Sequence, residues 1–282
     1  MKHIACTCLL AGALALPAGA AKSPVPQAPV ITYGLIRDEY GAPLTRSSSA
    51  SLALVRSDDR AGRVYATSDV GDSGVPGMNY RLSLEIDSSG PSRSYAVLAG
   101  TEMFVKATLG SVVTPMSPVA TFVTPPQGTS QRLDFSFGAD ADGDGMPDDW
   151  EAWQLDLAGR DSSPAGIAAF RPGDDADGDG MTNLQEYFAG TKPFLATDLL
   201  KITSIEVVPG TGRVKIAFTT TVKRTFRVLM TESLEKPNWT PVATTRDEGG
   251  ELVYEDYPGT GRTMTVYADA RLSSMFFRVA AN

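Results

Sequence analysis

Two segments rich in aspartate and glycine contain the residues of this chain best suited to chemistry. Segment 140–151 has carboxylates at its first, third, fifth, ninth and twelfth positions, and segment 175–186 repeats the pattern with an amide at the ninth. A loop of this length can supply about six to eight oxygen ligands to a calcium ion, provided that its sixth residue makes a sharp turn. Both segments therefore predict a calcium site.

The predicted ligands of the two loops differ in type only at the ninth position. In the first loop they are Asp140, Asp142, Asp144, Met146 through its carbonyl, Asp148 and Glu151. In the second loop they are Asp175, Asp177, Asp179, Met181 through its carbonyl, Asn183 and Glu186. Gly145 and Gly180 occupy the sixth position, where the turn requires a positive φ that glycine adopts without strain.

Solvated turns are the alternative explanation for segments rich in Asp-Gly pairs. Two complete matches that begin 35 residues apart, each with its glutamate in a predicted helix, argue against this alternative. Without metal, four or five carboxylates in one loop repel each other. We therefore expect loops that are disordered or partly protonated until a divalent cation neutralises them.

Apolar residues recur at helical spacing after each loop and predict helices at 148–157 and 183–189. These residues are Trp150, Trp153 and Leu157 in the first helix, and Leu184, Tyr187 and Phe188 in the second. We expect the two faces to form a small core, either with each other or with neighbouring domains. The alternative for Trp150 and Trp153 is stacking on a sugar ring.

The first 20 residues have the composition of a secretory leader. Lys2 supplies a positive start, residues 4–16 form an apolar run, and residues 18–20 are small. We expect cleavage after this leader, a short linker at 21–29, and a secreted or cell-envelope protein without a membrane span.

Cleavage of the leader would remove Cys6, Cys8 and the sole histidine, His3. The remaining chain could not form a Ser-His-Asp triad, a Cys-His pair or a Cys/His zinc site. An enzyme would have to use carboxylates, as glycosidases do. The scattered acids Glu85, Glu102, Glu232 and Glu255 lie in no recognisable motif, so we expect no enzyme.

The formal net charge of −8 disfavours nucleic acid as a partner and favours cations. Extracellular polysaccharide or another envelope protein is the further partner class that we consider.

Short alternating or β-branched runs separated by turn residues predict a mostly β chain. The expected strands are 30–37, 51–56, 63–67, 79–86, 103–108, 119–123 and 132–137, then 201–208, 213–219, 225–230, 242–245, 252–256, 263–267 and 275–279. We expect two β-sandwich domains, at 30–138 and 198–282, joined by a small calcium-loop and short-helix module at 139–197.

The two acidic loops and their helices resemble bacterial thrombospondin type 3 repeats. The resemblance implies an extracellular calcium-dependent module that acts as a stiff spacer in adhesion or surface proteins. Residues 34–44 also resemble the opening strand and turn of carboxypeptidase regulatory-like β-sandwich domains.

Two related calcium-binding classes fit the sequence less well. Dockerins usually have an aliphatic residue at the eighth loop position, where this chain has Pro147 and Thr182. Sensor EF-hands need a helix before each loop, whereas we predict a strand before the first and find Pro172-Gly173 before the second. The sequence thus predicts a structural or adhesion-type protein, with a carbohydrate- or protein-binding module, including a dockerin-like one, as the alternative.

Overall fold

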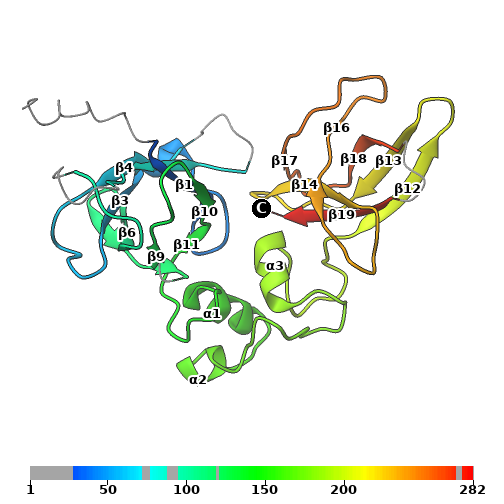
Figure 1. Ribbon diagram of the computed structural model, residues 1–282. Helices are drawn as coiled ribbons and strands as arrows, with labels where there is room; N and C mark the ends of the chain where they lie inside the picture. Colours follow the sequence, from blue (N-terminus) through cyan, green and yellow to red (C-terminus); the bar gives the residue numbers. More distant parts are fainter. Residues whose placement is uncertain (1–27, 72–76, 88–94, 119–120, 271–274, 282) are drawn as a thin grey trace, which may run out of the picture.

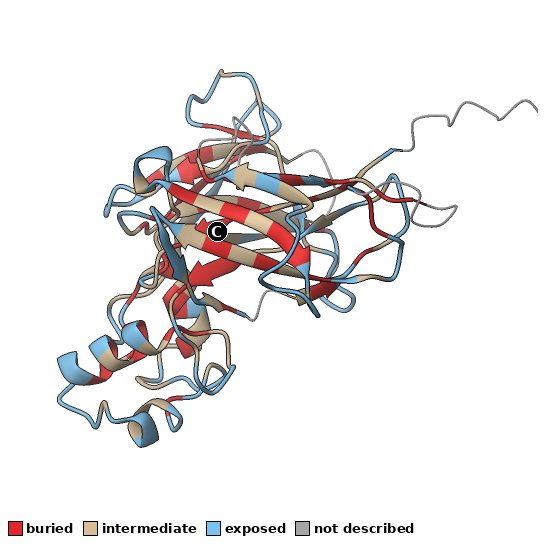
Figure 2. Ribbon diagram, turned by 90° about the vertical axis from the view of Figure 1, so that its left-hand side faces the viewer, coloured by how far each residue is buried: buried red, intermediate tan, exposed pale blue. Residues whose placement is uncertain are grey.

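The computed structural model describes residues 28–71, 77–87, 95–118, 121–270 and 275–281. Two groups of strands are joined by a small helical module from the middle of the sequence (Figure 1). Buried residues alternate with more exposed ones along many strands of both groups (Figure 2). The predicted mostly β, sandwich-like fold is confirmed. The predicted leader and most of the predicted linker lie outside the described residues.

The N-terminal group of strands surrounds one apolar core. Its elements are β1 (Val30–Gly34), β2 (Ile36–Arg37), the 3₁₀ turn η1 (Arg46–Ser48), β3 (Ala50–Arg56), β4 (Ala66–Asp69), β5 (Tyr80–Leu84), β6 (Glu102–Leu109), β7 (Val112–Thr114), β8 (Met116–Ser117), β9 (Thr121–Val123), β10 (Ser130–Arg132) and β11 (Phe135–Phe137). The sheets run in the orders β4-β3-β6-β7, with β9 also on β6, then β10-β1-β5 and β2-β11-β8. Alternation decides which residues are inside: Tyr80, Leu82 and Leu84 of β5 are buried.

Two predicted strands of this domain are each divided in two, because the chain turns a corner between sheets. Expected strand 30–37 becomes β1 and β2, and expected strand 132–137 becomes β10 and β11. At the break, the Asp134 carboxylate accepts the Leu35 N–H, and the Asn79 side chain bonds both backbone groups of Ile36. These side chains take the place of a neighbouring strand.

Other strand boundaries also differ from the sequence prediction. The strand expected at 63–67 lies at Ala66–Asp69, and the short strands β7 and β8 were not predicted. Residues 119 and 120 of expected strand 119–123 lie outside the described residues.

The C-terminal group forms two antiparallel sheets around a second core. Its strands are β12 (Ile202–Val208), β13 (Arg213–Phe218), β14 (Thr225–Thr231), β15 (Thr240–Pro241), β16 (Thr244–Thr245), β17 (Tyr257–Pro258), β18 (Met264–Asp269) and β19 (Phe276–Ala281). The sheet orders are β12-β13-β18-β16 and β15-β14-β17, with β19 also pairing with β14.

The strand predicted at 252–256 is wrong. Only Val253 forms a bridge there, to Thr244, and the strand β17 begins at Tyr257. The neighbouring Asp256 is instead paired with Arg227 of β14 through its side chain. The predicted strand 242–245 is replaced by the shorter β15 and β16.

The helical module contains α1 (Asp148–Leu157), α2 (Pro164–Ile167) and α3 (Asn183–Ala189). The bounds of α1 and α3 agree with the prediction, whereas α2 was missed. Its sequence signal is Ser163-Pro164, because the Ser163 hydroxyl accepts the Gly166 N–H as a helix cap and proline is favoured at the first helical position.

The module has its own core, in which the Trp150 ring lies 5.1 Å from that of Tyr187 and 6.1 Å from that of Phe170. The predicted apolar face of α1 is only partly correct. Trp150 is buried, but Trp153 is 45% exposed and Leu157 is 60% exposed, so the expectation that Trp153 is a core residue is wrong.

Candidate metal centres

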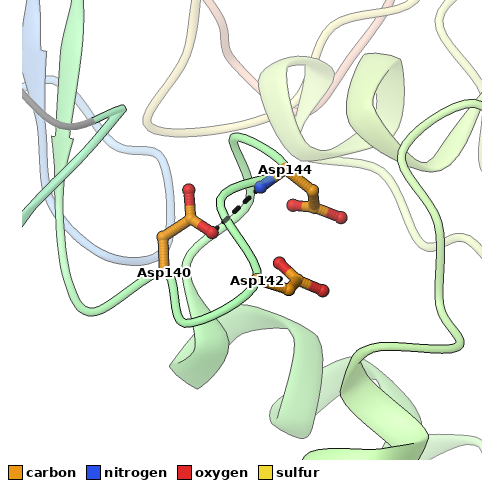
Figure 3. Close-up of side chains that lie close together, drawn as sticks. All are labelled: Asp140, Asp142 and Asp144. Carbon is orange, nitrogen blue, oxygen red and sulfur yellow. Dashed lines mark hydrogen bonds between the residues drawn. The ribbon is translucent and has the colours of Figure 1, made fainter.

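The first acidic loop follows β11 and folds around the carboxylate of its first residue. Asp140 Oδ1 accepts the N–H groups of Gly143 and Asp144, and Oδ2 accepts that of Gly145. Asp144 in turn accepts the Met146 N–H. The side chains of Asp140, Asp142 and Asp144 face one region, where an oxygen of each lies within 4.8 Å of the others (Figure 3).

The second loop repeats this network residue for residue. Asp175 Oδ1 accepts the N–H groups of Gly178 and Asp179, and Oδ2 accepts that of Gly180. Asp179 accepts the Met181 N–H. Oxygens of Asp175, Asp177 and Asp179 again lie within 4.8 Å of one another.

The glycine at the sixth position has the same backbone conformation in both loops. Gly145 and Gly180 each have φ of 98°. A Cβ added at either residue would meet no atom within 4 Å, so φ, not space, requires glycine there. The positive φ predicted from the sequence is confirmed.

The glutamates at the twelfth position are the most unusual groups of the site. Glu151 and Glu186 are both completely buried, on the first turns of α1 and α3. Neither carboxylate forms a hydrogen bond in the described part of the chain. The Thr191 hydroxyl lowers the pKa of Glu186, although no hydrogen bond joins the two side chains.

Burial and neighbouring carboxylates raise the pKa of both glutamates. The pKa of Glu151 rises to about 9 and that of Glu186 to about 8, in each case mainly through desolvation and then through the aspartates of the loop. Burial also raises the pKa of Asp144 to about 6. A buried anion without a partner costs roughly several kcal/mol. A cation could offset this charge, because among the described residues no basic side chain forms a salt bridge with these carboxylates.

The ninth position differs between the loops. Asp148 Oδ1 accepts the Ala141 N–H, which holds the start of the first loop. Asn183 is completely buried, its Nδ2 donates to the Arg171 carbonyl, and its Oδ1 has no hydrogen-bond partner among the described residues. The orientation of the Asn183 amide thus leaves Oδ1 free to act as a metal ligand.

The seventh position is taken by Met146 and Met181, whose carbonyl ligand role stays a prediction. The Met146 side chain belongs to the module core, and the Met181 sulfur accepts the Leu200 N–H at 3.2 Å. All the candidate donors are thus carboxylate, amide or carbonyl oxygens, the set that hard divalent cations prefer.

One contact to the first loop was not found by sequence reasoning. Ser117 of β8 is buried, and its hydroxyl donates to Asp140 Oδ2 over 2.6 Å. Ser117 lies 23 positions before Asp140 in the sequence, and its strand, β8, was not predicted. Without that strand, no sequence signal connects the two residues.

Arg224 connects α3 to both strand groups, and sequence reasoning also missed it. This buried guanidinium donates to the carbonyls of Tyr187 and Phe188, at the C-terminal end of α3, and to that of Tyr40 in the N-terminal domain. A positive charge at a helix C-terminus is favourable. The Thr221 hydroxyl donates to the last α3 carbonyl, that of Ala189.

Tyr187 and Phe188 secure the other side of α3. The Tyr187 hydroxyl donates to Ser136 Oγ of β11 over 2.7 Å. The guanidinium of Arg37, from β2, lies 5.0 Å from the centre of the Phe188 ring. The helix that follows the second loop therefore contacts both strand groups.

Comparison with protein-family models, with curated proteins and with solved structures gives no match to this chain. In the described ranges, each helix is too short and too polar to span a membrane.

Proposed function

We propose that this protein is a secreted or envelope-associated structural protein in which two calcium ions order the central module and stiffen the connection between two β-sandwich domains. The observation that carries the proposal is the pair of buried carboxylates, Glu151 and Glu186, without a hydrogen-bond donor. A cation in each loop would offset part of the negative charge of its glutamate and of the three aspartates that face the same region.

Calcium is a better fit than magnesium because the loops offer many protein oxygens. Magnesium is smaller, demands octahedral geometry and usually keeps several waters. A loop with up to five carboxylates and a carbonyl suits a larger ion with about six to eight ligands. The resemblance to thrombospondin type 3 repeats points to the same metal.

The stiffening role rests on the position of α3. Its first turn contains Glu186, a proposed ligand, while its C-terminal carbonyls accept hydrogen bonds from Arg224. Metal binding at the start of this helix would therefore stabilise a residue network that includes both strand groups. We infer a spacer or adhesion role and no catalytic reaction, and the leader-like segment 1–20 supports export.

Calorimetric titration of the purified protein with calcium tests this proposal, with magnesium as the control ion. We expect about two calcium ions per chain and weaker magnesium binding. Melting curves in calcium and in chelator should differ markedly, because a ligand that binds only the folded state stabilises it. Absence of binding at millimolar calcium would overturn the proposal.

Small-angle X-ray scattering tests the stiffening separately. We expect a narrow distribution of distances between the two domains in calcium and a broader one in chelator. Calcium binding with no change in scattering would retain the metal sites and contradict the spacer role.

A further inference from the structure

A cavity of about 420 Å³ lies where the three parts of the molecule meet. Its walls come from the loop after β2, from α1, from the residues after α3 and from the residues before β14. Pockets of this size commonly bind small molecules or one unit of a polymer. None of the candidate metal ligands of the two loops lines it.

Two half-exposed aromatic rings form one wall. Tyr40 is 44% exposed and Trp153 is 45% exposed, and their rings meet edge to face at 5.6 Å between centroids. Exposed aromatic faces of this kind pack well against the C–H face of a flat ring. The helical spacing predicted that Trp153 is a core residue, whereas in the structure Trp153 lines this cavity.

The cavity is positively charged although the whole chain carries −8. Lys192 and Lys223 line it, are exposed and form no salt bridge in the described part of the chain. The buried Arg224 adds a third positive charge, because all its hydrogen bonds go to carbonyl groups. Among the described residues that line the cavity, Asp38 is the one carboxylate. An anion is the favoured ligand.

Gln154 provides a polar group without a partner. It is only 3% exposed, and it lines the cavity from α1. Its side-chain amide forms no hydrogen bond with any described residue. A buried amide normally has hydrogen-bond partners, so this one is available to a ligand that offers both donors and acceptors.

We propose that this cavity binds an acidic saccharide, a pyranose unit that carries a carboxylate. The sugar ring would pack on Trp153 and Tyr40, its hydroxyls would bond the Gln154 amide, and its carboxylate would pair with Lys192 and Lys223. A pyranose with a carboxylate has the ring, the hydroxyls and the charge at once, whereas an open-chain hydroxy acid lacks the ring and a neutral sugar lacks the charge. This inference goes beyond the proposed spacer role, because it adds a ligand for the joined domains.

The test compares a trimer of β-1,4-linked glucuronate with cellotriose, which has the same linkage and no carboxylate. Calorimetry of the purified protein at saturating calcium should show binding of the glucuronate trimer and much weaker binding of cellotriose. Added salt should weaken the binding, because the lysine contacts are exposed and screened. Equal binding of both sugars, or of neither at millimolar concentration, would overturn the proposal.

Variants locate the binding at this cavity. Trp153→Ala should weaken glucuronate binding by about tenfold or more, as truncation of a central aromatic contact commonly does. Lys223→Asn should weaken it by about two- to fivefold. Asparagine suits this position because Lys223 has a left-handed backbone with φ of 59°.

The matched controls are Trp239→Ala and Lys236→Gln, which remove the same residue types outside the cavity. They should leave binding unchanged, and calcium-dependent melting curves should show that all four variants fold. Binding that survives Trp153→Ala in a folded protein, or that is lost equally in the controls, would contradict the proposed site.

Discussion

The two acidic loops have the same internal structure but different surroundings. Each centres on the first aspartate, each has a sixth-position glycine with φ of 98°, and each buries its final glutamate. The first loop is tied to the N-terminal domain through Ser117. The second leads into α3, which Arg224 connects to both domains.

Metal binding would act locally on the conformation of each loop and at a distance through the helix that follows the loop. The conformation of a loop is determined within twelve residues, so both loops have it. What each ion would stabilise depends on the element that follows. We therefore expect the first site to order mainly α1 and the second to control the connection between domains.

The largest expected effect is a change in how stability depends on pH when the metal is removed. The pKa values of Glu151, about 9, and Glu186, about 8, lie above the ordinary value of 4.5. The folded protein in chelator therefore binds more protons than the unfolded chain across this window. The stabilising contribution of these groups is complete below pH 4.5 and is lost as the pH rises through about 8 to 9.

In calcium the folded state keeps these carboxylates ionised, as the unfolded chain does above its ordinary pKa. Stability in calcium should therefore rise with pH near 4.5 and then stay level up to about 9. Melting temperatures measured across this pH range, in calcium and in chelator, check the prediction. If melting temperature changed with pH in the same way in calcium and in chelator, the assignment of both glutamates as metal ligands would be contradicted.

Neutralising one glutamate at a time should distinguish the loops. Glu151→Gln and Glu186→Gln should each remove one ion, at a cost of about 2.7 kcal/mol when calcium is at 100 times its dissociation constant. In chelator at neutral pH both variants should be more stable than the wild type, because a buried glutamate must take up a proton when the chain folds and a glutamine need not. Calorimetry and melting curves measure these changes.

Only Glu186→Gln should also broaden the distance distribution between domains in scattering. The exposed Glu232→Gln is the control and should have no effect. Equal broadening by Glu151→Gln would show that the two loops do not differ as we infer.

Replacing Arg224 tests the connection without touching a metal ligand. Arg224→Met leaves the carbonyls of Tyr40, Tyr187 and Phe188 without their donor, and should cost about 3 kcal/mol in the free energy of unfolding. Calcium should still bind both loops while the domains separate more freely in scattering. Arg278→Met, which removes an exposed guanidinium beside Trp239, is the matched control.

Matched glycine variants test the equality of the two loops. Gly145→Ala and Gly180→Ala force a left-handed conformation on a residue with Cβ, which costs roughly 1–2 kcal/mol each. Because neither added methyl meets another atom, the two costs should be equal. Gly173→Ala, where the backbone is ordinary and the space is open, should be neutral in chemical denaturation. Unequal costs would show that the surroundings act on loop conformation.

The smallest expected effect concerns the anchor of the first loop. Ser117→Ala removes one hydrogen bond to Asp140 and should cost about 1 kcal/mol. Calorimetry should show weaker calcium binding at one site and no change at the other. Weakening of both sites would mean that the loops are coupled.

Particular residues show which elements of the fold could be predicted from the sequence. The start of α1 and of α3 was predictable because each helix begins at the ninth position of a loop of fixed length, which places the final glutamate of the loop in the first turn. The strand pattern predicted two mostly β regions. The division of strand 30–37 could not be predicted, because it depends on Asn79 and Asp134, which lie far away in sequence.

Periodicity alone failed on α1. It grouped Trp150 with Trp153 and Leu157, whereas the structure buries Trp150 with Glu151 and Gln154. The orientation of the helix is set by the loop, whose last ligand position must face inward even though it is a carboxylate. A hydrophobic pattern does not contain that requirement.

By itself, the sequence determined the composition and local geometry of the two acidic loops, since each depends on contacts within a dozen residues. Only the tertiary structure decided how those loops are used. Ser117, Arg224 and the residues of the cavity beside Trp153 come from distant positions in the chain. Their contacts with the module depend on how the sheets and helices pack. No local sequence pattern encodes that packing.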